Sequence, residues 1–280
     1  MLIALDTLDA ALDGVGAVVV DQYGVLHDGS APYSLAVETL QRLRARGTRI
    51  AVLSNSGKRA QPNADRIAAI GFPPDLFECT MTSGEALWRD MRSGRLAFPA
   101  LYPITRAMHD AKSWAEGLDV VFSGIDSADA VLLMGLPDNA QAEDCRGILE
   151  RARMRDIPVL CSNPDRAAPR ADGRCVISPG ALAHAHAEAG GRVIFYGKPH
   201  LPVYRAVEVA LNLPPEKLLM VGDSLEHDIA GARAAGWRSV FVRGGLHAGA
   251  FGADGIESTI AALARSMRAP IPDYTLEHLR

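Results

Sequence analysis

Polar side chains stand directly after apolar stretches of the sequence, where the carboxyl ends of strands are expected. They are Asp21 after AVVV, Ser54 after IAVL, Asp223 after LLMVG and Lys198 after VIFYG. Carboxylate oxygens are the ligands that Mg²⁺ prefers. An ammonium group and a hydroxyl group add donors for an anion. Metal and donors together neutralise a doubly charged phosphate, so these residue types predict a phosphate site.

A further acidic residue can join this set, and Asp21 itself has two possible roles. Asp228 follows Asp223 by five positions, in GDSLEHD, and can support a metal site from the first turn of the next helix. Asp21 has two roles open to it. It is either a metal ligand only, or the nucleophile that attacks phosphorus and forms an aspartyl-phosphate.

Apolar strands alternate with amphipathic helices around these residues, which predicts a parallel sheet covered on both faces. Ligands of such sheets bind outside the carboxyl ends of the strands, where the strand order reverses. We therefore predict a doubly wound, Rossmann-like α/β core. Its expected strands are 17–20, 49–55, 192–197, 217–223 and 239–245, and its expected helices are 34–46, 63–70, 202–211 and 225–235.

An inserted domain is expected between the strands that carry Ser54 and Lys198. That interval is roughly a hundred residues longer than one more helix and strand require. It contains its own expected strands and helices, which are strands 98–105, 118–124, 129–135 and 157–163 and helices 105–116 and 140–155. We predict a core formed by residues 1–82 and 182–280 and an inserted α/β domain formed by residues 83–181.

Composition narrows the class of protein. The 280 residues are 48% hydrophobic and 22% charged, which is typical of a folded globular chain. A net charge of −4 gives no basic surface for nucleic acid. The start, MLIALD, does not resemble a signal peptide, and no apolar run has the ~18 residues of a membrane span. The four cysteines lack C-x-x-C spacing. We expect a cytoplasmic protein with reduced thiols and no nucleic-acid or membrane partner.

Four segments of the chain resemble, in the right order, the four motifs of the haloacid-dehalogenase superfamily. These segments are DQYGVLHDG, LSNSG, YGKPH and VGDSLEHDIAGARAAG. The insertion between the second and third motifs resembles that of the class IIA branch, whose cap domain is of the C2 type. CSNPD resembles the Asn-Pro-Asp loop by which these caps reach the substrate. The branch includes sugar-phosphate, nitrophenyl-phosphate and pyridoxal-phosphate phosphatases.

This resemblance implies a function and a cofactor. The expected reaction is Mg²⁺-dependent hydrolysis of a small phosphate monoester through an aspartyl-phosphate. The expected partner is a small phosphorylated metabolite, and association of copies through the cap domain is left open.

The resemblance also implies roles for individual residues. Asp21 would be the nucleophile, with Tyr23 and Lys198 as the other catalytic residues. The expected metal ligands are Asp21, Asp223, Asp228 and the main-chain carbonyl of Tyr23. The residues expected to bind phosphate or substrate are Gly24, Ser54, Asn55 and Lys198 in the core and Asn163 and Asp165 in the cap.

Tyr23 departs from the family pattern, in which a second aspartate protonates the leaving oxygen and activates water. A phenol with a pKa near ~10 donates a proton but is a poor base at neutral pH, so we expect low turnover. Two alternatives stay open: a phosphometabolite-binding protein with impaired catalysis, and a 2-haloacid dehalogenase-type hydrolase. His27 is a second candidate for the acid–base group. The glycines of VRGGLHAG are expected to form a plain loop, with a place at the site as the alternative.

Overall fold

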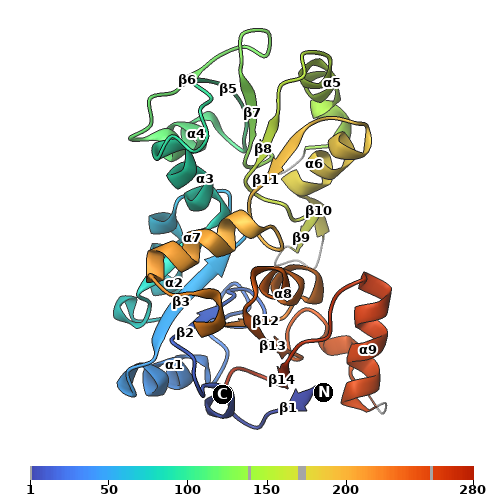
Figure 1. Ribbon diagram of the computed structural model, residues 1–280. Helices are drawn as coiled ribbons and strands as arrows, with labels where there is room; N and C mark the ends of the chain where they lie inside the picture. The colour runs from blue at the N-terminus through green and yellow to red at the C-terminus, as the bar shows by residue number, and fades with distance from the viewer. Residues whose placement is uncertain (1, 138–139, 170–174, 253–254) are drawn as a thin grey trace. The chain divides into compact units, whose positions relative to one another are not determined.

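The computed structural model describes residues 2–137, 140–169, 175–252 and 255–280 (Figure 1). Contacts between Cα atoms divide the chain into two compact units. The first unit contains the chain up to Ser54, then Gln61–Met81 and Tyr204–Arg280. The second unit contains Asn55–Ala60 and Thr82–Val203.

The strands described for the first unit form one seven-stranded sheet in the order β1-β14-β13-β12-β2-β3-β4. Their bounds are Ile3–Ala4 for β1, Tyr274–Leu276 for β14, Arg238–Val242 for β13, Leu218–Gly222 for β12, Ala17–Val20 for β2, Arg49–Ser54 for β3 and Cys79–Thr82 for β4. In the two central pairings, which are parallel, Val20 lies beside Val221 of β12 and Val52 of β3. The ends of β12, β2 and β3 therefore share one edge of the sheet, as the sequence predicts.

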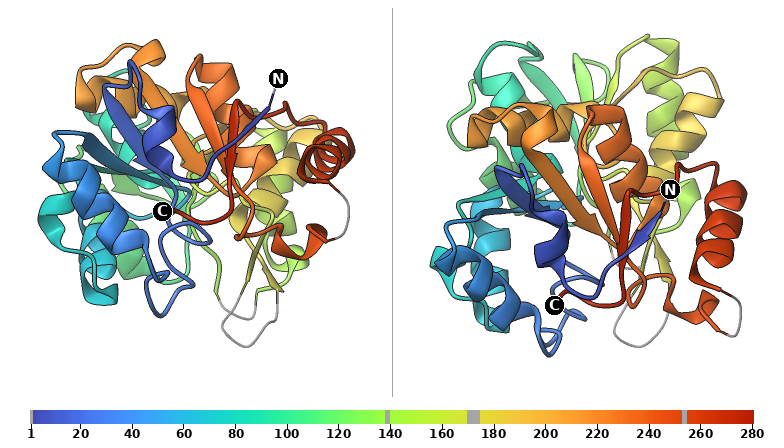
Figure 2. Two further views of the ribbon diagram at one scale, coloured as in Figure 1. Left: turned by 90° about the horizontal axis from the view of Figure 1, so that it is seen from below. Right: turned by 60° about the horizontal axis from the view of Figure 1, so that its bottom comes forward.

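Both faces of this sheet are buried, which explains why its strands are continuously apolar. Alternate residues such as Val18 and Val20 pack in a cluster with Leu40 of α1 (Ala36–Ala45) and Ile67 of α2 (Ala60–Ile70). On the other face, Phe241 packs with Ile260 of α9 (Ile256–Met267). Figure 2 shows α9 in red beside the strands of this unit.

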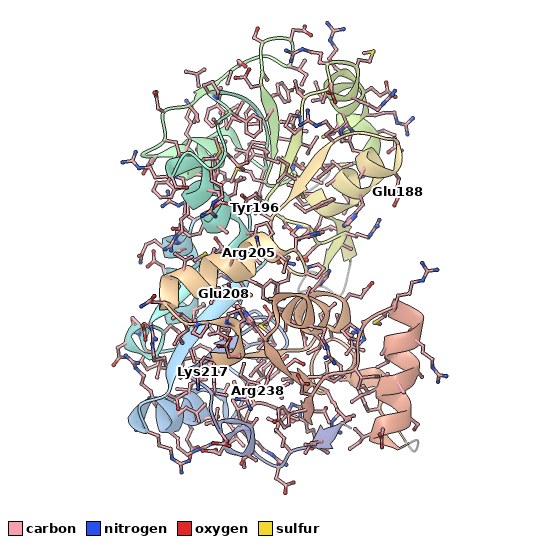
Figure 3. All side chains as sticks on the ribbon, viewed as in Figure 1. Glu188, Tyr196, Arg205, Glu208, Lys217 and Arg238 are labelled. Atoms are coloured by element: carbon pink, nitrogen blue, oxygen red, sulfur yellow. The ribbon has the colours of Figure 1, made fainter. Side chains whose placement is uncertain are left out.

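Two helices of the first unit meet through aromatic rings. Tyr204 of α7 (Leu201–Leu211) is fully buried, and its ring lies edge-on to Trp237, 4.9 Å between centroids. Trp237 follows α8 (Ala230–Ala235) and donates a hydrogen bond to Glu208 of α7 at 2.8 Å. Figure 3 labels Glu208 on this helix. These contacts fix α7 against α8, the helix that follows the acidic segment GDSLEHD.

The second unit has its own sheet, in the order β11-β8-β7-β5-β6 within the described residues, and every pairing in it is parallel. Its strands are β5 (Ala100–Ile104), β6 (Val121–Phe122), β7 (Ala130–Leu133), β8 (Val159–Cys161) and β11 (Val193–Phe195). Its helices are α3 (Ser83–Arg92), α4 (Met108–Ala115), α5 (Arg146–Met154) and α6 (Pro179–Glu188). Two further strands, β9 (Ala167–Pro169) and β10 (Cys175–Ile177), pair antiparallel. The α/β fold with parallel sheets is confirmed in both units.

One expectation about this division is wrong. Strand 192–197 is expected in the core from the sequence, whereas β11 pairs with β8 of the second unit in register Val193↔Val159. Val193 and Phe195 pack against the apolar cluster of that unit, which includes Val159 and Cys161. The sequence of an apolar strand does not show which sheet the strand will join. The pairing of β11 with β8 therefore cannot be predicted from the sequence. The second unit consequently runs beyond Ala181, to Val203.

Within the described residues, no helix combines the length and the apolar composition that crossing a bilayer requires. Cys161, at the end of β8, is a fully buried free thiol. Burial raises the pKa of this thiol to about 12, with a hydrogen bond to the Asn163 carbonyl acting in the opposite direction. Cys161 is therefore an unreactive thiol.

Candidate active site

Asp21, Asp223 and Asp228 come together in the first unit. Each offers one carboxylate oxygen, and these oxygens lie within 4.8 Å of one another. Asp21 follows β2 and Asp223 follows β12, which are neighbours in the sheet. Asp21 is partly exposed, whereas Asp223 and Asp228 are 4% and 0% exposed. Among the described residues, the structure thus brings together the acidic side chains that the sequence predicts as metal ligands.

The turn after β2 is held by its own backbone. The Asp21 amide donates to the Val221 carbonyl of β12 at 2.9 Å, which continues the ladder by one residue past the end of β2. The Gln22 carbonyl then accepts from Val25, Leu26 and His27 amides at 2.8–3.3 Å. The Gln22 side chain is buried and donates to Asn63 of α2 at 3.3 Å. This turn fixes the backbone on both sides of Tyr23.

Only glycine can occupy position 24, because Asp223 lies too close for a side chain. The φ of Gly24 is +82°, a region that side chains disfavour, and a Cβ built on this residue would lie 1.8 Å from Asp223 Oδ2. The sequence predicts that Gly24 permits close approach of a phosphate. In the structure, the group that lies closest to the missing side chain of Gly24 is the Asp223 carboxylate.

The loop after β13 also encloses Asp223. The Leu246 amide donates to Asp223 Oδ2 at 2.7 Å. A Cβ on Gly245 would lie 2.3 Å from the same oxygen and 2.6 Å from the Gly24 carbonyl. The expectation of a plain loop for VRGGLHAG is therefore wrong, and the alternative, a place at the site, holds. β13 lies beside β12, so the loop that follows it reaches the residue that follows β12.

Asp228 lies in a single π-helical turn, Leu225–Ile229. The sequence predicts the start of an α-helix at this place. Asp228 Oδ2 accepts from the Ser224 amide at 3.0 Å, and Ser224 Oγ accepts from the His227 amide at 3.2 Å. The Tyr204 hydroxyl donates to the His227 carbonyl at 2.9 Å. Burial, together with Asp228 and Asp21, raises the pKa of Tyr204. Tyr204 is thus a neutral donor that fixes the turn carrying Asp228, and π-turns of this kind are frequent at functional sites.

Tyr23 is half exposed, at 49%, and the edge of its ring faces His27, with centroids 6.4 Å apart. His27 itself is only 2% exposed. Its Nδ1 accepts from the Gly29 amide at 3.0 Å, and its Nε2 is buried with no hydrogen-bond partner. Burial, followed by Arg66, lowers the pKa of His27. His27 is therefore a neutral part of the turn, an arrangement that does not suit the acid–base role considered for it.

Apart from Asp21, the acidic residue nearest to Tyr23 in sequence is Asp28. Its side chain forms the hydrogen bonds of a turn. Its Oδ1 accepts from Ser30 N, Ser30 Oγ and Ala31 N at 2.8–2.9 Å. Hydrogen bonds from Ala31 and Ser30 lower the pKa of Asp28 to about 2. A carboxylate of such low basicity is a poor substitute for the aspartate that the family has at position 23.

A second cluster of predicted residues lies in the second unit, around Asn55. Asn55 Oδ1 accepts from the Lys198 amide at 2.6 Å, and Asn55 Nδ2 donates to the Lys198 carbonyl at 3.2 Å. The same Nδ2 donates to Asp165 Oδ1 at 2.7 Å. The Asp165 amide in turn donates to Asn163 Oδ1 at 3.2 Å. Asn55 and Lys198 are 8% and 3% exposed, so these contacts are shielded from solvent.

Close backbone contacts surround this cluster. Gly197 has φ +105°, and a Cβ on it would lie 2.4 Å from Ser83 Oγ and 2.6 Å from Pro164 Cδ. The preceding residue, Tyr196, is labelled in Figure 3. Its hydroxyl donates to Asp90 of α3 at 2.5 Å. Ser83 is not among the site residues that the sequence predicts. Its only signal is that the small pair Ser83-Gly84 begins the helical segment α3.

The predicted site residues therefore form two groups. The first unit holds Asp21, Tyr23, Gly24, Ser54, Asp223 and Asp228. The second unit holds Asn55, Asn163, Asp165 and Lys198. The chain itself links the groups, because Ser54 ends β3 and Asn55 follows it directly. The roles assigned to these residues from the sequence stay predictions.

The acidic group fits a divalent cation. Three carboxylates within 4.8 Å of one another repel when ionised, and a cation removes that repulsion. All three offer hard oxygen ligands, which suit Mg²⁺ with its ligand distances of about 2.0–2.1 Å. Gly24 and Gly245 keep side-chain atoms away from Asp223. By its donor set and by these two glycines, the site is one that Mg²⁺ would fit.

Two family models match the chain where these groups lie. The model described as haloacid dehalogenase-like hydrolase matches residues 18–99, and a HAD-hydrolase-like model matches residues 195–277. Together they contain Asp21, Ser54, Lys198, Asp223 and Asp228. The chain belongs to the haloacid-dehalogenase superfamily of hydrolases, and the resemblance drawn from its motifs is confirmed.

Individual relatives agree with this assignment over nearly the whole chain. Mouse chronophin is 27% identical over 269 residues, which cover 94% of this chain and 90% of chronophin. Chicken glycerol-3-phosphate phosphatase is 24% identical over 260 residues, which cover 86% and 83%. The crystal structure of a haloacid dehalogenase-like hydrolase from Brucella suis 1330 is 28% identical, with a TM-score of 0.80, and the match covers 99% of this chain and 100% of that one.

Proposed function

We propose that the protein hydrolyses a small phosphate monoester in an Mg²⁺-dependent reaction that proceeds through an aspartyl-phosphate on Asp21. The observation that carries this proposal is the convergence of Asp21, Asp223 and Asp228, with oxygens within 4.8 Å, at the carboxyl ends of β2 and β12. A similar chain of nearly the same length, from chicken, is a glycerol-3-phosphate phosphatase. That relative supports a phosphate ester as the substrate class.

In the proposed site, Asp21, Asp223, Asp228 and the Tyr23 main-chain carbonyl would hold the ion, which supplies positive charge that neutralises the phosphate. Asp21 is partly exposed, so one of its oxygens can reach a phosphorus atom. Its attack forms an O–P bond and breaks the bond between phosphorus and the ester oxygen. The leaving oxygen receives a proton from the Tyr23 hydroxyl. The Tyr23 oxygen regains a proton from solvent. Water, which loses one proton to solvent, then cleaves the aspartyl-phosphate, frees the Asp21 carboxylate and releases inorganic phosphate.

The other predicted residues bind and orient the phosphate in this proposal. The Ser54 hydroxyl donates to its oxygens, and the Lys198 ammonium offsets its charge. Asn55 uses its side-chain donors on the Lys198 carbonyl and on Asp165, so it serves the phosphate by holding these two residues. The second unit acts as the cap, with Asn163 and Asp165 facing the organic part of the substrate. The ordered bonds from Asn55 to Lys198 and Asp165 support this role, because they hold the three residues in one arrangement.

A second candidate is a protein that binds a phosphometabolite and turns it over weakly. Tyr23 favours it, since a phenol is a poor base and the nearby His27 and Asp28 are both engaged in the turn. The dehalogenase candidate is less well supported, because such enzymes need no metal and the acidic group here suits one.

One assay separates these candidates. Purified protein is incubated with a panel of phosphorylated metabolites, nitrophenyl phosphate and 2-haloacids, with and without Mg²⁺, while released phosphate and halide are measured. Phosphate release that requires Mg²⁺ supports the proposal. Metabolite binding without release favours the binding protein, and metal-independent halide release favours the dehalogenase.

A further inference from the structure

The residues that follow Ser54 form a short segment, residues 55–60, that is bonded to the start of α3 along its length. The Ser56 carbonyl accepts from the Gly84 amide at 3.0 Å. The Lys58 carbonyl accepts from Thr82 Oγ1 at 2.5 Å. A Cβ on Gly84 would lie 2.0 Å from the Gly57 carbonyl oxygen, so the two backbones are in direct contact. Segment 55–60 therefore has a fixed path.

One end of this segment organises the substrate group. Asn55 fixes the Lys198 backbone by two hydrogen bonds and reaches Asp165 with a third. Any movement of Asn55 would change all three bonds together. The position of Lys198 relative to Asp165 thus depends on the position of Asn55, the first residue of segment 55–60.

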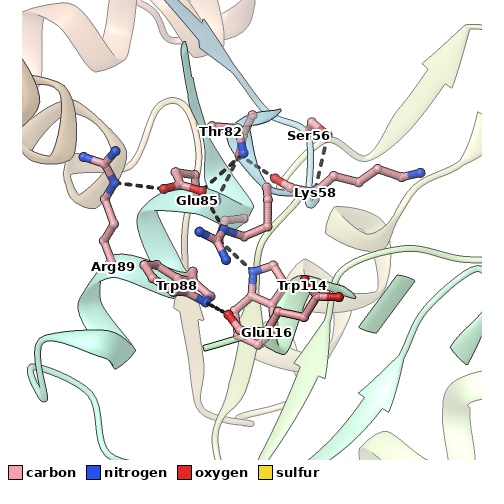
Figure 4. A network of polar contacts seen from close by, with 11 residues as sticks. Ser56, Lys58, Thr82, Glu85, Trp88, Arg89, Trp114 and Glu116 are labelled. Carbon is pink, nitrogen blue, oxygen red and sulfur yellow. Dashed lines mark hydrogen bonds and ion pairs between the residues drawn. The ribbon is translucent and has the colours of Figure 1, made fainter. Parts of the chain in front are cut away.

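Glu85 fixes the other end of the segment (Figure 4). Glu85 Oε2 accepts from Arg59 Nε at 2.6 Å and from the Ala60 amide at 3.2 Å, while Oε1 accepts from Arg89 Nε at 3.0 Å. The Ala60 amide is the first of α2, so its bond to a carboxylate also suits the positive end of the helix. Glu85 is the charged anchor of this segment.

This anchor is shielded and tightly packed. Glu85 is 6% exposed, and its amide donates to Thr82 Oγ1 at 2.9 Å as part of the helix cap. The Arg59 guanidinium lies over the Trp88 ring, 3.6 Å from the ring centroid. Removing the Glu85 charge would leave Arg59 without its carboxylate in a site where water replaces it poorly. Arg59 and Ala60 would then lose their fixed position.

We propose that Glu85 is a positioning residue for substrate binding, which acts through segment 55–60 on Asn55 and thereby on Lys198 and Asp165. This inference rests on the proposed function for its substrate, but its structural part concerns the free protein. Glu85 has no part in the acidic group of the first unit. Its loss should therefore weaken substrate binding and leave metal binding and the chemical step nearly unchanged.

The test compares Glu85→Gln with a matched control, Glu78→Gln. Glu78 accepts from Arg49 Nε and Nη2 at 2.8 and 2.5 Å, so the same chemical change breaks an Arg–Glu pair elsewhere, at a more exposed position. For Mg²⁺-dependent nitrophenyl phosphate hydrolysis, Glu85→Gln should raise KM about 10-fold or more and change kcat less than about threefold, the signature of lost uniform binding. Glu78→Gln should leave both constants unchanged.

A double-mutant cycle asks whether Glu85 acts through Asn55. Asn55→Ala should raise KM on its own, and adding Glu85→Gln to it should raise KM little further, because the two changes interrupt one route. Independent, multiplying effects on KM would overturn the proposal. So would an equal fall in kcat and in Mg²⁺ affinity for Glu85→Gln.

Amide hydrogen exchange tests the same inference without any substrate. In Glu85→Gln the Lys198 amide, bonded to Asn55 Oδ1, should exchange faster than in the unaltered protein. The Asp21 amide, bonded to the Val221 carbonyl, should exchange as before. Unchanged exchange at Lys198 would overturn the inference even if the enzyme is active. If no ester is hydrolysed, the proposed function fails and this measurement decides the inference alone. Arg59→Gln breaks the same pair if Glu85→Gln does not fold.

Discussion

The carboxylate of Asp223 occupies the space beside Gly24 where a side chain would begin. A Cβ at Gly24 would lie 1.8 Å from Asp223 Oδ2 and 2.7 Å from its Cγ. The turn after β2 and the end of β12 thus meet at a distance that only glycine permits. Because Asp21 and Tyr23 lie directly before Gly24 in the same turn, any change at Gly24 should disturb the acidic group as a whole.

Gly24→Ala should therefore abolish Mg²⁺ binding. The control is Gly14→Ala, which has a similar φ of +71° but nothing within 4 Å of the new Cβ. Both variants carry the backbone strain of about 1 kcal/mol that a left-handed alanine costs, but only Gly24→Ala displaces Asp223. Calorimetric titration with Mg²⁺ and thermal melting measure the two effects. Equal Mg²⁺ affinity in both variants would show that Mg²⁺ binding does not depend on the position of the Asp223 carboxylate.

Asp223→Asn should weaken Mg²⁺ affinity by about 10-fold or more, since a neutral amide replaces a charged oxygen ligand. Activity should fall in parallel and recover in part at high Mg²⁺. The bond from the Leu246 amide can be kept by the asparagine oxygen, so the fold should survive. Titration with Mg²⁺ in the free protein, followed by activity against Mg²⁺ concentration, gives both quantities. Activity that falls with unchanged affinity would place Asp223 outside the metal site.

Tyr23→Asp should raise steady-state hydrolysis about 10-fold or more, because a positioned carboxylate can activate the water that a phenol leaves inactive. Tyr23 is half exposed, so the smaller side chain requires no repacking. Tyr23→Phe is the control, since it keeps the ring beside His27 and removes only the proton donor. Steady-state rates with nitrophenyl phosphate and with an alkyl phosphate measure the effect. A slower Tyr23→Asp enzyme would mean that the tyrosine belongs to an efficient mechanism.

Glu85 should make stability depend on acid pH. Burial raises the pKa of Glu85, but hydrogen bonds from Arg59 and Arg89 lower it by more, so the folded pKa lies below its usual value of 4.5. The stabilisation is complete above the unfolded pKa and is lost as pH falls through the folded one. Chemical unfolding from pH 6 to pH 3 should show a loss of stability that Glu85→Gln lacks. Parallel curves for the two proteins would contradict this.

Residues fixed by local pattern were predictable from the sequence. Asp21, Ser54 and Asp223 each end an apolar stretch, and parallel strands place such residues at one edge of a sheet. The pairing of Asn55 with Lys198 could not be read from the sequence, because it depends on β11 joining the second sheet. For the loop around Gly245, the sequence favours a plain loop over a place at the site, since its contact with Asp223 follows only from β13 lying beside β12.

Direct detection of phosphate on Asp21 tests the central claim. The protein is mixed with nitrophenyl phosphate and Mg²⁺, quenched in acid within milliseconds to seconds, and analysed for released nitrophenol and for the mass of the peptide containing Asp21. The account predicts a burst of about one nitrophenol per protein, matched by phosphate on Asp21, that requires Mg²⁺ and is absent in Asp21→Asn. Phosphate release by Asp21→Asn at the unaltered rate, or hydrolysis with no phosphate ever on Asp21, would contradict it.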